Sequence, residues 1–302
     1  MFKDINDLME HVAGKKQQKT VAVAAAADEH TLEAVCRAEK DGYVKPLLIG
    51  DKKEILRILK EIGESVDEDR IYDVTGDGEI AKMAVRLVRE GKADFIMKGL
   101  LNTSDVLKAV LNKQEGLKHG GLLTVMAMLE VPGYHKLLAI NDAAVIPYPN
   151  LESKKEQIKM VTGAMHKMGY DDNLKVAAVC ANENVNPKIT ETLEASQLKK
   201  MNQEGEITGC IVEGPISIDL ALRPEIAKAK KYESPVAGDA DLLLFPTLVS
   251  ANCYSKAVEM TGARAVSFVL GAQVPIALTS RATTAENKYC TVVLASAMVG
   301  GL

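Results

Sequence analysis

Short apolar runs alternate with amphipathic stretches along almost the whole chain, and this alternation constrains the fold more than any other feature. Strand-like runs at residues 20–27, 46–49 and 71–74 are each followed by about ten residues with apolar positions at helical spacing. Parallel strands need a crossover connection, which a helix of this length supplies. The pattern therefore predicts an α/β architecture with largely parallel sheets flanked by helices.

The second half of the chain repeats the pattern. Helices are expected there at residues 153–168, 187–203, 254–260 and 284–298, and strands at 175–180, 210–213, 240–245, 265–270 and 275–279. A further strand of the first half is expected at 94–97. The middle differs, because the apolar runs 122–129, 137–140 and 144–146 follow one another with no helix between them. We expect an antiparallel element there and a domain junction near residues 130–150. A chain of 302 residues suggests about two domains, at roughly 150 residues each.

Composition excludes several classes of protein. The 37 Lys and Arg residues are outnumbered by 41 Asp and Glu, so no overall basic field for nucleic acid is expected. The sequence contains no run of 18 apolar residues, so no membrane span is expected. The first residues lack the apolar core of a signal peptide. The five cysteines form no CxxC pair, which favours buried thiols in a reducing, cytoplasmic setting.

Common cofactor and metal motifs are absent from the sequence. It contains no GxGxxG after the first strand, no GxxxxGK[ST] and no HExxH. In doubly wound sheets ligands collect at the carboxyl ends of strands, so the polar residues there are the first candidates. They are Asp28-Glu29, Lys98-Gly99, Asn182, Glu213-Gly214-Pro215, Asn252 and Ser280-Arg281.

The strongest local candidate is the Ser280-Arg281 pair, between an expected strand and an expected helix. Free N–H groups at a helix start favour an anion, and the planar guanidinium of Arg281 matches phosphate geometry. The alternative is simple helix capping, with Thr283 as the N-cap and Glu286 completing a capping box. The residues alone leave both interpretations open.

Two further candidates are weaker. Lys98 follows a buried run, Gly99 permits close backbone approach, and Thr103 or Ser104 could cap the next helix; the alternative is a surface lysine before a turn. Asn252 and Lys256 share one helical face. The nearby Asp239 and Asp241 could hold a metal ion, although loop solvation and capping explain such a pair more often.

At these places the sequence resembles the phosphate acyltransferase family, most closely its phosphate butyryltransferase branch. The matching segments occur in the family's order over nearly the whole chain. They are VAVAAAAD (21–28), MKGLLNTSDVLKAVL (97–111), NDAAVIPYP (141–149), VEGPISID (212–219), SPVAGDADLLL (234–244), NCYSK (252–256) and PIALTSR (275–281).

The resemblance implies an enzyme that converts acyl-CoA and phosphate into acyl phosphate and CoA, with no permanently bound cofactor. No metal is expected either, because the sequence lacks metal-ligand spacing. It implies the two-domain fold of isocitrate and isopropylmalate dehydrogenases, a site in the interdomain cleft and a homodimer. The first domain would be residues 1–136 with the returning helix 281–302, and the second 137–280. The family's Ser-Arg pair falls on Ser280 and Arg281, and its cleft Asn and Lys on Asn252 and Lys256. Substrate contacts are also expected from Lys98, Gly99, Thr103, Asp142, Gly214 and Pro215.

Three positions depart from the family pattern. The acetyl branch has a catalytic Asp where this chain has Asn287, and a common cysteine where it has Ala143; butyryl relatives often carry an acid at Thr283. Glu286 is then the carboxylate nearest in sequence to the Ser-Arg pair and the expected proton carrier. Longer acyl chains than acetyl are favoured. The alternatives are phosphate acetyltransferase, a dehydrogenase of the same fold that uses NAD and a metal, and a catalytically impaired CoA-binding paralogue.

Overall fold

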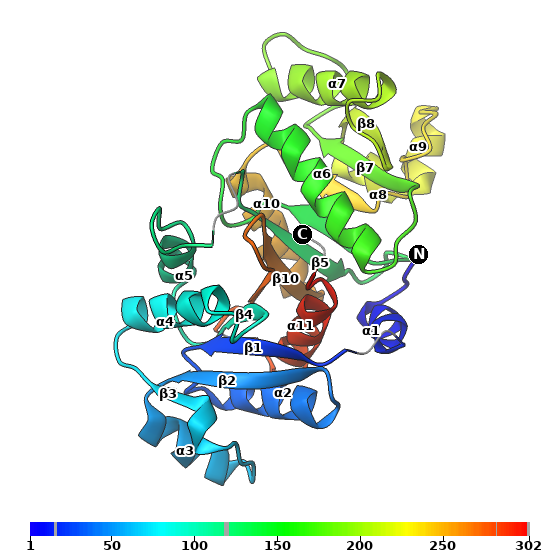
Figure 1. Cartoon of the computed structure of the whole chain (residues 1–302). Helices are drawn as coiled ribbons and strands as arrows, with labels where there is room; N and C mark the ends of the chain where they lie inside the picture. The colour runs from blue at the N-terminus through cyan, green and yellow to red at the C-terminus, as the bar shows by residue number, and fades with distance from the viewer. Residues whose placement is uncertain (15–16, 118–120, 282, 301–302) are drawn as a thin grey trace. The chain divides into compact units, whose positions relative to one another are not determined.

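The computed structural model describes residues 1–14, 17–117, 121–281 and 283–300. The chain divides into two compact units. Unit 1 comprises Met1–Leu8 and Leu122–Ala265, and unit 2 comprises Met9–Gly121 and Val266–Leu302. Each unit contains its own set of strands covered by helices (Figure 1). The expected α/β class with largely parallel strands is confirmed.

The strands of unit 2 lie in the order β3-β2-β1-β4-β11-β10. Neighbouring strands pair in parallel, except for the antiparallel pair β10 and β11. The last strand of the chain, β11, therefore lies between β10 and β4. The bounds are β1 (Lys19–Ala24), β2 (Val44–Gly50), β3 (Ile71–Asp73), β4 (Phe95–Lys98), β10 (Arg264–Leu270) and β11 (Ile276–Leu278).

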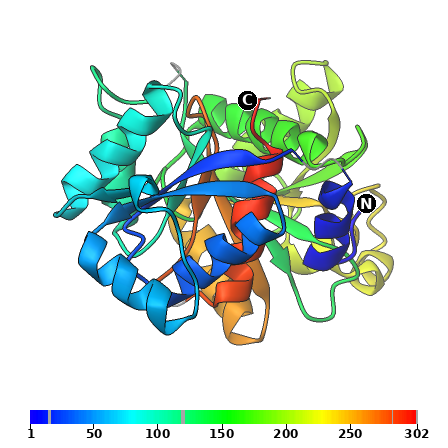
Figure 2. The ribbon, with the colours of Figure 1, turned by 60° about the horizontal axis from the view of Figure 1, so that its bottom comes forward.

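Helices cover both faces of this sheet. One face carries α2 (Glu29–Lys40), with α11 (Ala285–Ala297) packed beside it, and α3 (Lys52–Glu61) next to α2; the other carries α4 (Asp77–Arg89) and α5 (Thr103–Val110) (Figures 1 and 2). Asp28 caps α2 by accepting the Thr31 N–H, and Asp51 caps α3 in the same way. Such caps satisfy N–H groups that the helix itself leaves unpaired.

In unit 1 the strands run in the order β5-β6-β9-β7-β8, and only β5 and β6 pair in antiparallel fashion. This pair is the antiparallel element expected in the middle of the chain. The bounds are β5 (Thr124–Glu130), β6 (Leu138–Asn141), β7 (Leu174–Val179), β8 (Cys210–Ile216) and β9 (Leu242–Leu244).

The helices of unit 1 also lie in two groups. α6 (Leu151–Lys167) and α7 (Thr190–Gln203) pack together, while α8 (Ile218–Leu222), α9 (Pro224–Lys230) and α10 (Leu248–Met260) share an apolar core with the strands. α1 (Ile5–Ala13) contains the point at which the chain passes from unit 1 to unit 2. Among the described residues, none of the helices has both the length and the apolar content that crossing a bilayer requires.

Some expected elements differ from the structure. The expected strand at 144–146 is wrong, because the N–H groups of Ala144, Val145 and Ile146 all donate to the Asp142 carboxylate and form a turn. Helix α7 begins at Thr190 rather than at residue 187, and α10 begins at Leu248, where Thr247 and Ser250 form a capping box.

The compact units also divide the chain differently from the expected domains. Residues 122–136 lie in unit 1, where β5 pairs with β6, and residues 266–280 lie in unit 2, where β11 pairs with β4. Backbone pairing between strands distant in sequence decides this division. It places Ser280 and Arg281 in the same unit as Lys98.

Candidate active site

The two strongest sequence candidates meet at one edge of the unit 2 sheet. Strands β4 and β11 are parallel neighbours, with Lys98 in register with Leu278. The Thr279 hydroxyl donates a hydrogen bond of 2.9 Å to the Lys98 carbonyl. Ser280 and Arg281 follow directly, so the carboxyl ends of both strands deliver these residues to the same edge.

Lys98 is buried, with an exposed fraction of 3%. Its ammonium donates to the carbonyls of Gly99 and Leu101, each at 3.1 Å. Burial, together with the positive charges of Lys288 and Arg281, lowers the pKa of Lys98 to about 8. Within the described part of the chain, no carboxylate lies within ion-pair distance of this ammonium. The interpretation of Lys98 as a surface lysine is therefore wrong.

Gly99 allows the chain after β4 to approach the end of β1. A Cβ atom at this position would lie 2.2 Å from the carbonyl oxygen of Ala25, far closer than any contact allows. The N–H groups of Gly99 and Leu100 donate to the carbonyls of Ala24 and Ala25. The close approach that the sequence predicts is present, and the partner is the backbone of the neighbouring strand.

The Ser280-Arg281 junction is exposed. One terminal nitrogen of Arg281, Nη2, donates to Asn102 Oδ1 at 3.1 Å, and the Ser280 carbonyl accepts the Thr283 N–H. Helix α11 is capped by Thr284, whose side chain accepts the Asn287 N–H. The predicted capping box of Thr283 and Glu286 is therefore wrong. Capping of α11 does not use the side chains of Ser280 and Arg281, which leaves them able to contact an anion.

Glu286 points to a different partner. Its carboxylate forms an ion pair with the Arg37 guanidinium of α2, and half of its side chain is exposed. The guanidinium of Arg37 also lies over the Tyr289 ring, 3.9 Å from its centre. Glu286 therefore fastens the first turn of α11 to α2.

A buried cluster behind this edge was not predicted from the sequence. The ammonium of Lys288, whose side chain is 1% exposed, lies 2.6 Å from Asp28 Oδ2 and 2.9 Å from Thr31 Oγ1. These partners hold the pKa of the Asp28 carboxyl below its usual range, although burial acts in the opposite direction. Asp28 itself is one of the polar strand ends, but nothing in the sequence links it to a residue 260 positions away.

Thr103 begins α5, and the N-cap residue is Asn102. The expectation that Thr103 or Ser104 caps this helix is therefore wrong. Thr103 is half-buried beside the loop that carries Lys98 and Gly99. Unit 2 thus contains Lys98, Gly99, Thr103, Ser280, Arg281 and Glu286 of the predicted set.

The remaining predicted residues lie in unit 1. Asp142 is buried, and its carboxylate accepts three backbone N–H groups and the Thr124 hydroxyl. Burial raises the pKa of Asp142, against the opposing effect of these donors. The Asn252 amide donates to the Ala143 carbonyl at 3.1 Å, which joins α10 to the same turn. Lys256 is exposed and paired with Glu259 at 2.9 Å.

Gly214 and Pro215 are buried within β8, joined by a cis peptide bond. A Cβ atom on Gly214 would lie 2.7 Å from the Ala178 Cβ and 3.1 Å from the Ala195 Cβ. Packing between β7 and α7 is thus sufficient to explain this glycine. Within the described residues, no hydrogen bond connects Gly214 or Pro215 to Asp142 or Asn252.

The acidic pair of unit 1 is neutralised by lysines. Buried Lys136 lies 2.8 Å from Asp239 and 2.7 Å from Asp241, while Lys175 and His135 also contact Asp239. Among the described residues, no three His, Cys, Asp or Glu side chains cluster as metal ligands do. Of the cysteines, Cys253 is exposed, which corrects the expectation that all are buried.

We expect activity to persist in excess chelator, because the carboxylates of Asp239 and Asp241 are already paired with lysine side chains. The rate of the acyl-transfer reaction that the sequence resemblance implies, measured before and after treatment with EDTA, should be unchanged. Loss of the rate that a divalent ion restores would contradict this expectation.

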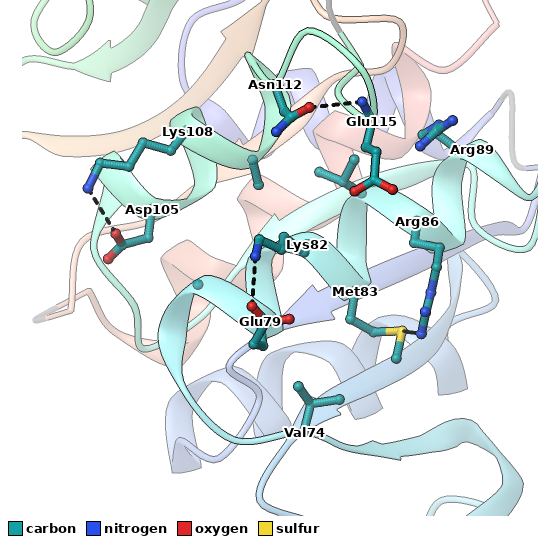
Figure 3. A pocket seen from close by; sticks show the side chains of 13 residues that line it. Val74, Glu79, Lys82, Met83, Arg86, Arg89, Asp105, Lys108, Asn112 and Glu115 are labelled. Atoms are coloured by element: carbon teal, nitrogen blue, oxygen red, sulfur yellow. Dashed lines mark hydrogen bonds and ion pairs between the residues drawn. The ribbon is translucent and has the colours of Figure 1, made fainter.

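A pocket of about 440 Å³ lies between α4 and α5 in unit 2. Figure 3 shows its charged side chains, of which Lys82 pairs with Glu79 at 2.7 Å and Lys108 with Asp105 at 3.5 Å. This pocket was not predicted from the sequence, because most of its lining residues belong to two ordinary amphipathic helices. None of the predicted site residues lines it.

Comparison with known proteins gives consistent matches. A family model described as phosphate acetyl/butaryl transferase matches residues 77–296. Phosphate butyryltransferase of Clostridium acetobutylicum is 38% identical over 301 residues, 99% of each chain. Phosphate acetyltransferase of Thermotoga maritima is 39% identical over 293 residues, 97% of this chain and 98% of its own.

Solved structures agree. A branched-chain phosphotransacylase from Enterococcus faecalis has a TM-score of 0.79 at 28% identity, covering 94% of this chain and all of its own. A 4-hydroxythreonine-4-phosphate dehydrogenase from Burkholderia phymatum has a TM-score of 0.53 at 17% identity, covering 92% of this chain and 99% of its own. The second match concerns the fold alone and confirms the expected dehydrogenase-like architecture.

Fold and matches together define an acyltransferase of the α/β class. The family model spans well over half of the chain, and relatives above 30% identity cover nearly all of it. The chain belongs to the phosphate acetyl/butaryl transferase family.

Proposed function

We propose that the protein exchanges a short acyl group between coenzyme A and inorganic phosphate by direct transfer, giving an acyl phosphate and free coenzyme A. The observation that carries the proposal is the pair of cations Lys98 and Arg281 at one edge of unit 2. Lys98 is buried, and its hydrogen-bond partners among the described residues are two neutral carbonyls, which is costly for an ammonium. A phosphate dianion is the counter-ion that this arrangement suits.

In the proposed reaction an oxygen of phosphate attacks the thioester carbonyl carbon, and negative charge collects on the carbonyl oxygen. The carbon–sulfur bond then breaks and the thiolate of coenzyme A leaves. Arg281 stabilises the charge that develops, while Lys98 and the Ser280 hydroxyl hold phosphate. The proton that phosphate loses is taken up by the thiolate, so no net proton is released. Because the pKa of a thiol is about 8.5, the thiolate leaves without a dedicated strong acid.

Unit 1 residues are proposed to contact coenzyme A. Lys256 is exposed and suits the charge of its phosphates, and Asn252 is held in place by the Ala143 carbonyl. Asp142 shapes the turn that supplies this carbonyl. Gly214 and Pro215 act through packing of the strand that carries them. We further propose, from the family, a cytoplasmic homodimer with no permanently bound cofactor.

The acyl group is proposed to be butyryl or a similar short or branched chain. The relatives include both butyryl- and acetyl-transferring enzymes, and the position of the acetyl branch's catalytic Asp is Asn287 here. A panel of acetyl-, propionyl-, butyryl- and isobutyryl-CoA, assayed for thiol release with and without phosphate, tests the proposal. Phosphate-dependent release, fastest with a four-carbon chain, is expected. Release without phosphate, or no release, would contradict it.

Glu286→Gln is expected to keep kcat within about twofold in both directions, because the carboxylate is tied to Arg37 and surface ion pairs contribute little. The measurement is kcat against pH for acyl phosphate formation and for acyl-CoA synthesis. Arg37→Gln, which removes the other partner, serves as the control. A large loss confined to Glu286→Gln, with an altered pH profile, would instead identify Glu286 as the proton carrier.

A further inference from the structure

Asn102 occupies a helix-capping position without capping the helix. An Asn at the N-cap normally accepts a backbone N–H of the first turn through its side chain. Here the side chain of Asn102 makes no such bond, although its backbone carbonyl accepts the Asp105 N–H at 3.1 Å. Instead Asn102 Oδ1 accepts a hydrogen bond from Arg281 Nη2 at 3.1 Å. The Asn102 Nδ2 group donates to Asp105 Oδ2 at 3.3 Å.

The loop before Asn102 is held rigidly. Lys98 Nζ binds the carbonyls of Gly99 and Leu101, and the N–H groups of Gly99 and Leu100 bind the end of β1. Asn102 therefore projects from a loop that is fixed through several backbone atoms. The guanidinium that it contacts belongs to an exposed residue on a different segment, 179 positions away.

We propose that Asn102 is a positioning residue that fixes the orientation of the Arg281 guanidinium for phosphate. This inference rests on the proposed function. The amide oxygen occupies one of the five N–H donors of Arg281 and leaves the others for the ligand. A neutral acceptor suits this place, because a carboxylate would neutralise Arg281 and compete with phosphate. Departure from a local capping rule is itself typical of functional positions.

The test is the Asn102→Asp variant. Aspartate caps helices as well as asparagine does, so a purely structural role predicts wild-type kinetics. A role at the anion site predicts that the KM for phosphate rises about tenfold or more, while the KM for acyl-CoA and the thermal midpoint change little. Asn112→Asp places the same charge at the other end of α5 and should leave the KM for phosphate unchanged.

Asn102→Ala completes the experiment. It removes the acceptor, so kcat should fall about tenfold and the loss should not add to that of Arg281→Lys in the double variant. If Arg281→Lys impairs the enzyme but Asn102→Asp keeps the KM for phosphate within about twofold, the inference is overturned and the proposed function stands. If Arg281→Lys has no effect, the Ser280-Arg281 junction is not the reaction centre and the proposed site fails with the inference, whereas failure of the proposed function itself would show as an absence of phosphate-dependent thiol release in the acyl-CoA panel.

Discussion

Arg281→Lys is expected to lower kcat by about 10²–10³-fold for acyl phosphate formation and for acyl-CoA synthesis. Lysine keeps the positive charge, but it lacks the planar fork that binds two oxygens at once and that Asn102 holds from one side. The same group serves both directions, because both pass through one tetrahedral intermediate. The measurement is kcat in each direction for the purified, folded variant.

Arg223→Lys is the matched control, since Arg223 is an exposed arginine paired with a single carboxylate, Glu225. It should behave as the wild type does. Near-wild-type rates for Arg281→Lys in both directions would show that the Ser280-Arg281 junction is not the reaction centre.

Lys98→Gln is expected to raise the KM for phosphate about 10–100-fold, the amount that a charge-assisted hydrogen bond contributes. Glutamine retains N–H donors for the Gly99 and Leu101 carbonyls, so the loop keeps partners while the charge is lost. Lys92→Gln, at an exposed lysine paired with Glu90, should leave the KM unchanged. An unaltered KM in a folded Lys98→Gln variant would remove Lys98 from the site.

The pH dependence of the wild type should report the same group. Lys98 has a pKa of about 8, so its ammonium is charged below that pH and neutral above it. We expect the KM for phosphate to rise above about pH 8 in the wild type and to stay flat in Lys98→Gln. The free energy of unfolding should change with pH in the opposite direction to phosphate binding. The folded pKa lies below the ordinary value of 10.5, so the unfolded chain binds more protons between these values. The cost of burying the Lys98 ammonium is relieved as pH rises through this range, and the free energy of unfolding therefore increases. Urea unfolding of the wild type and of Lys98→Gln between about pH 8 and 10.5 measures this change in the free energy of unfolding.

Local patterns predicted the architecture and both segments of the candidate site. Lys98 and Arg281 each follow a buried apolar run, and the carboxyl ends of parallel strands gather ligand-binding residues. Their meeting at one edge was not predicted, because the expected domain boundary assigned Ser280 to the second domain, whereas β11 pairs with β4 in unit 2. The same kind of local rule failed at Glu286. Its spacing from Thr283 fits a capping box, but Arg37, distant in sequence, binds the carboxylate instead.

Partners that lie far apart in the sequence account for the other misses. From the sequence, Lys288 is an ordinary helix residue. In the structure α11 packs against α2, which buries the Lys288 ammonium beside Asp28. In the sequence, Asp239 and Asp241 resemble half of a metal site. In the structure both carboxylates form ion pairs with Lys136. The apolar residues 144–146 resemble a strand in the sequence, but their N–H groups donate to the buried carboxylate of Asp142 instead of to a neighbouring strand.

The position of β11 between β4 and β10 has a consequence for how the enzyme forms during synthesis. Apart from its first eight residues, unit 1 is one continuous stretch, so it can begin to fold while the ribosome is still making the rest. Unit 2 has to wait, because β11 and α11 follow the whole of unit 1 in the chain. Lys98 is made before the continuous stretch of unit 1, yet it gains Arg281 as a neighbour only after unit 1 has been made. A nascent chain therefore lacks the proposed phosphate site until β11 is inserted between β4 and β10.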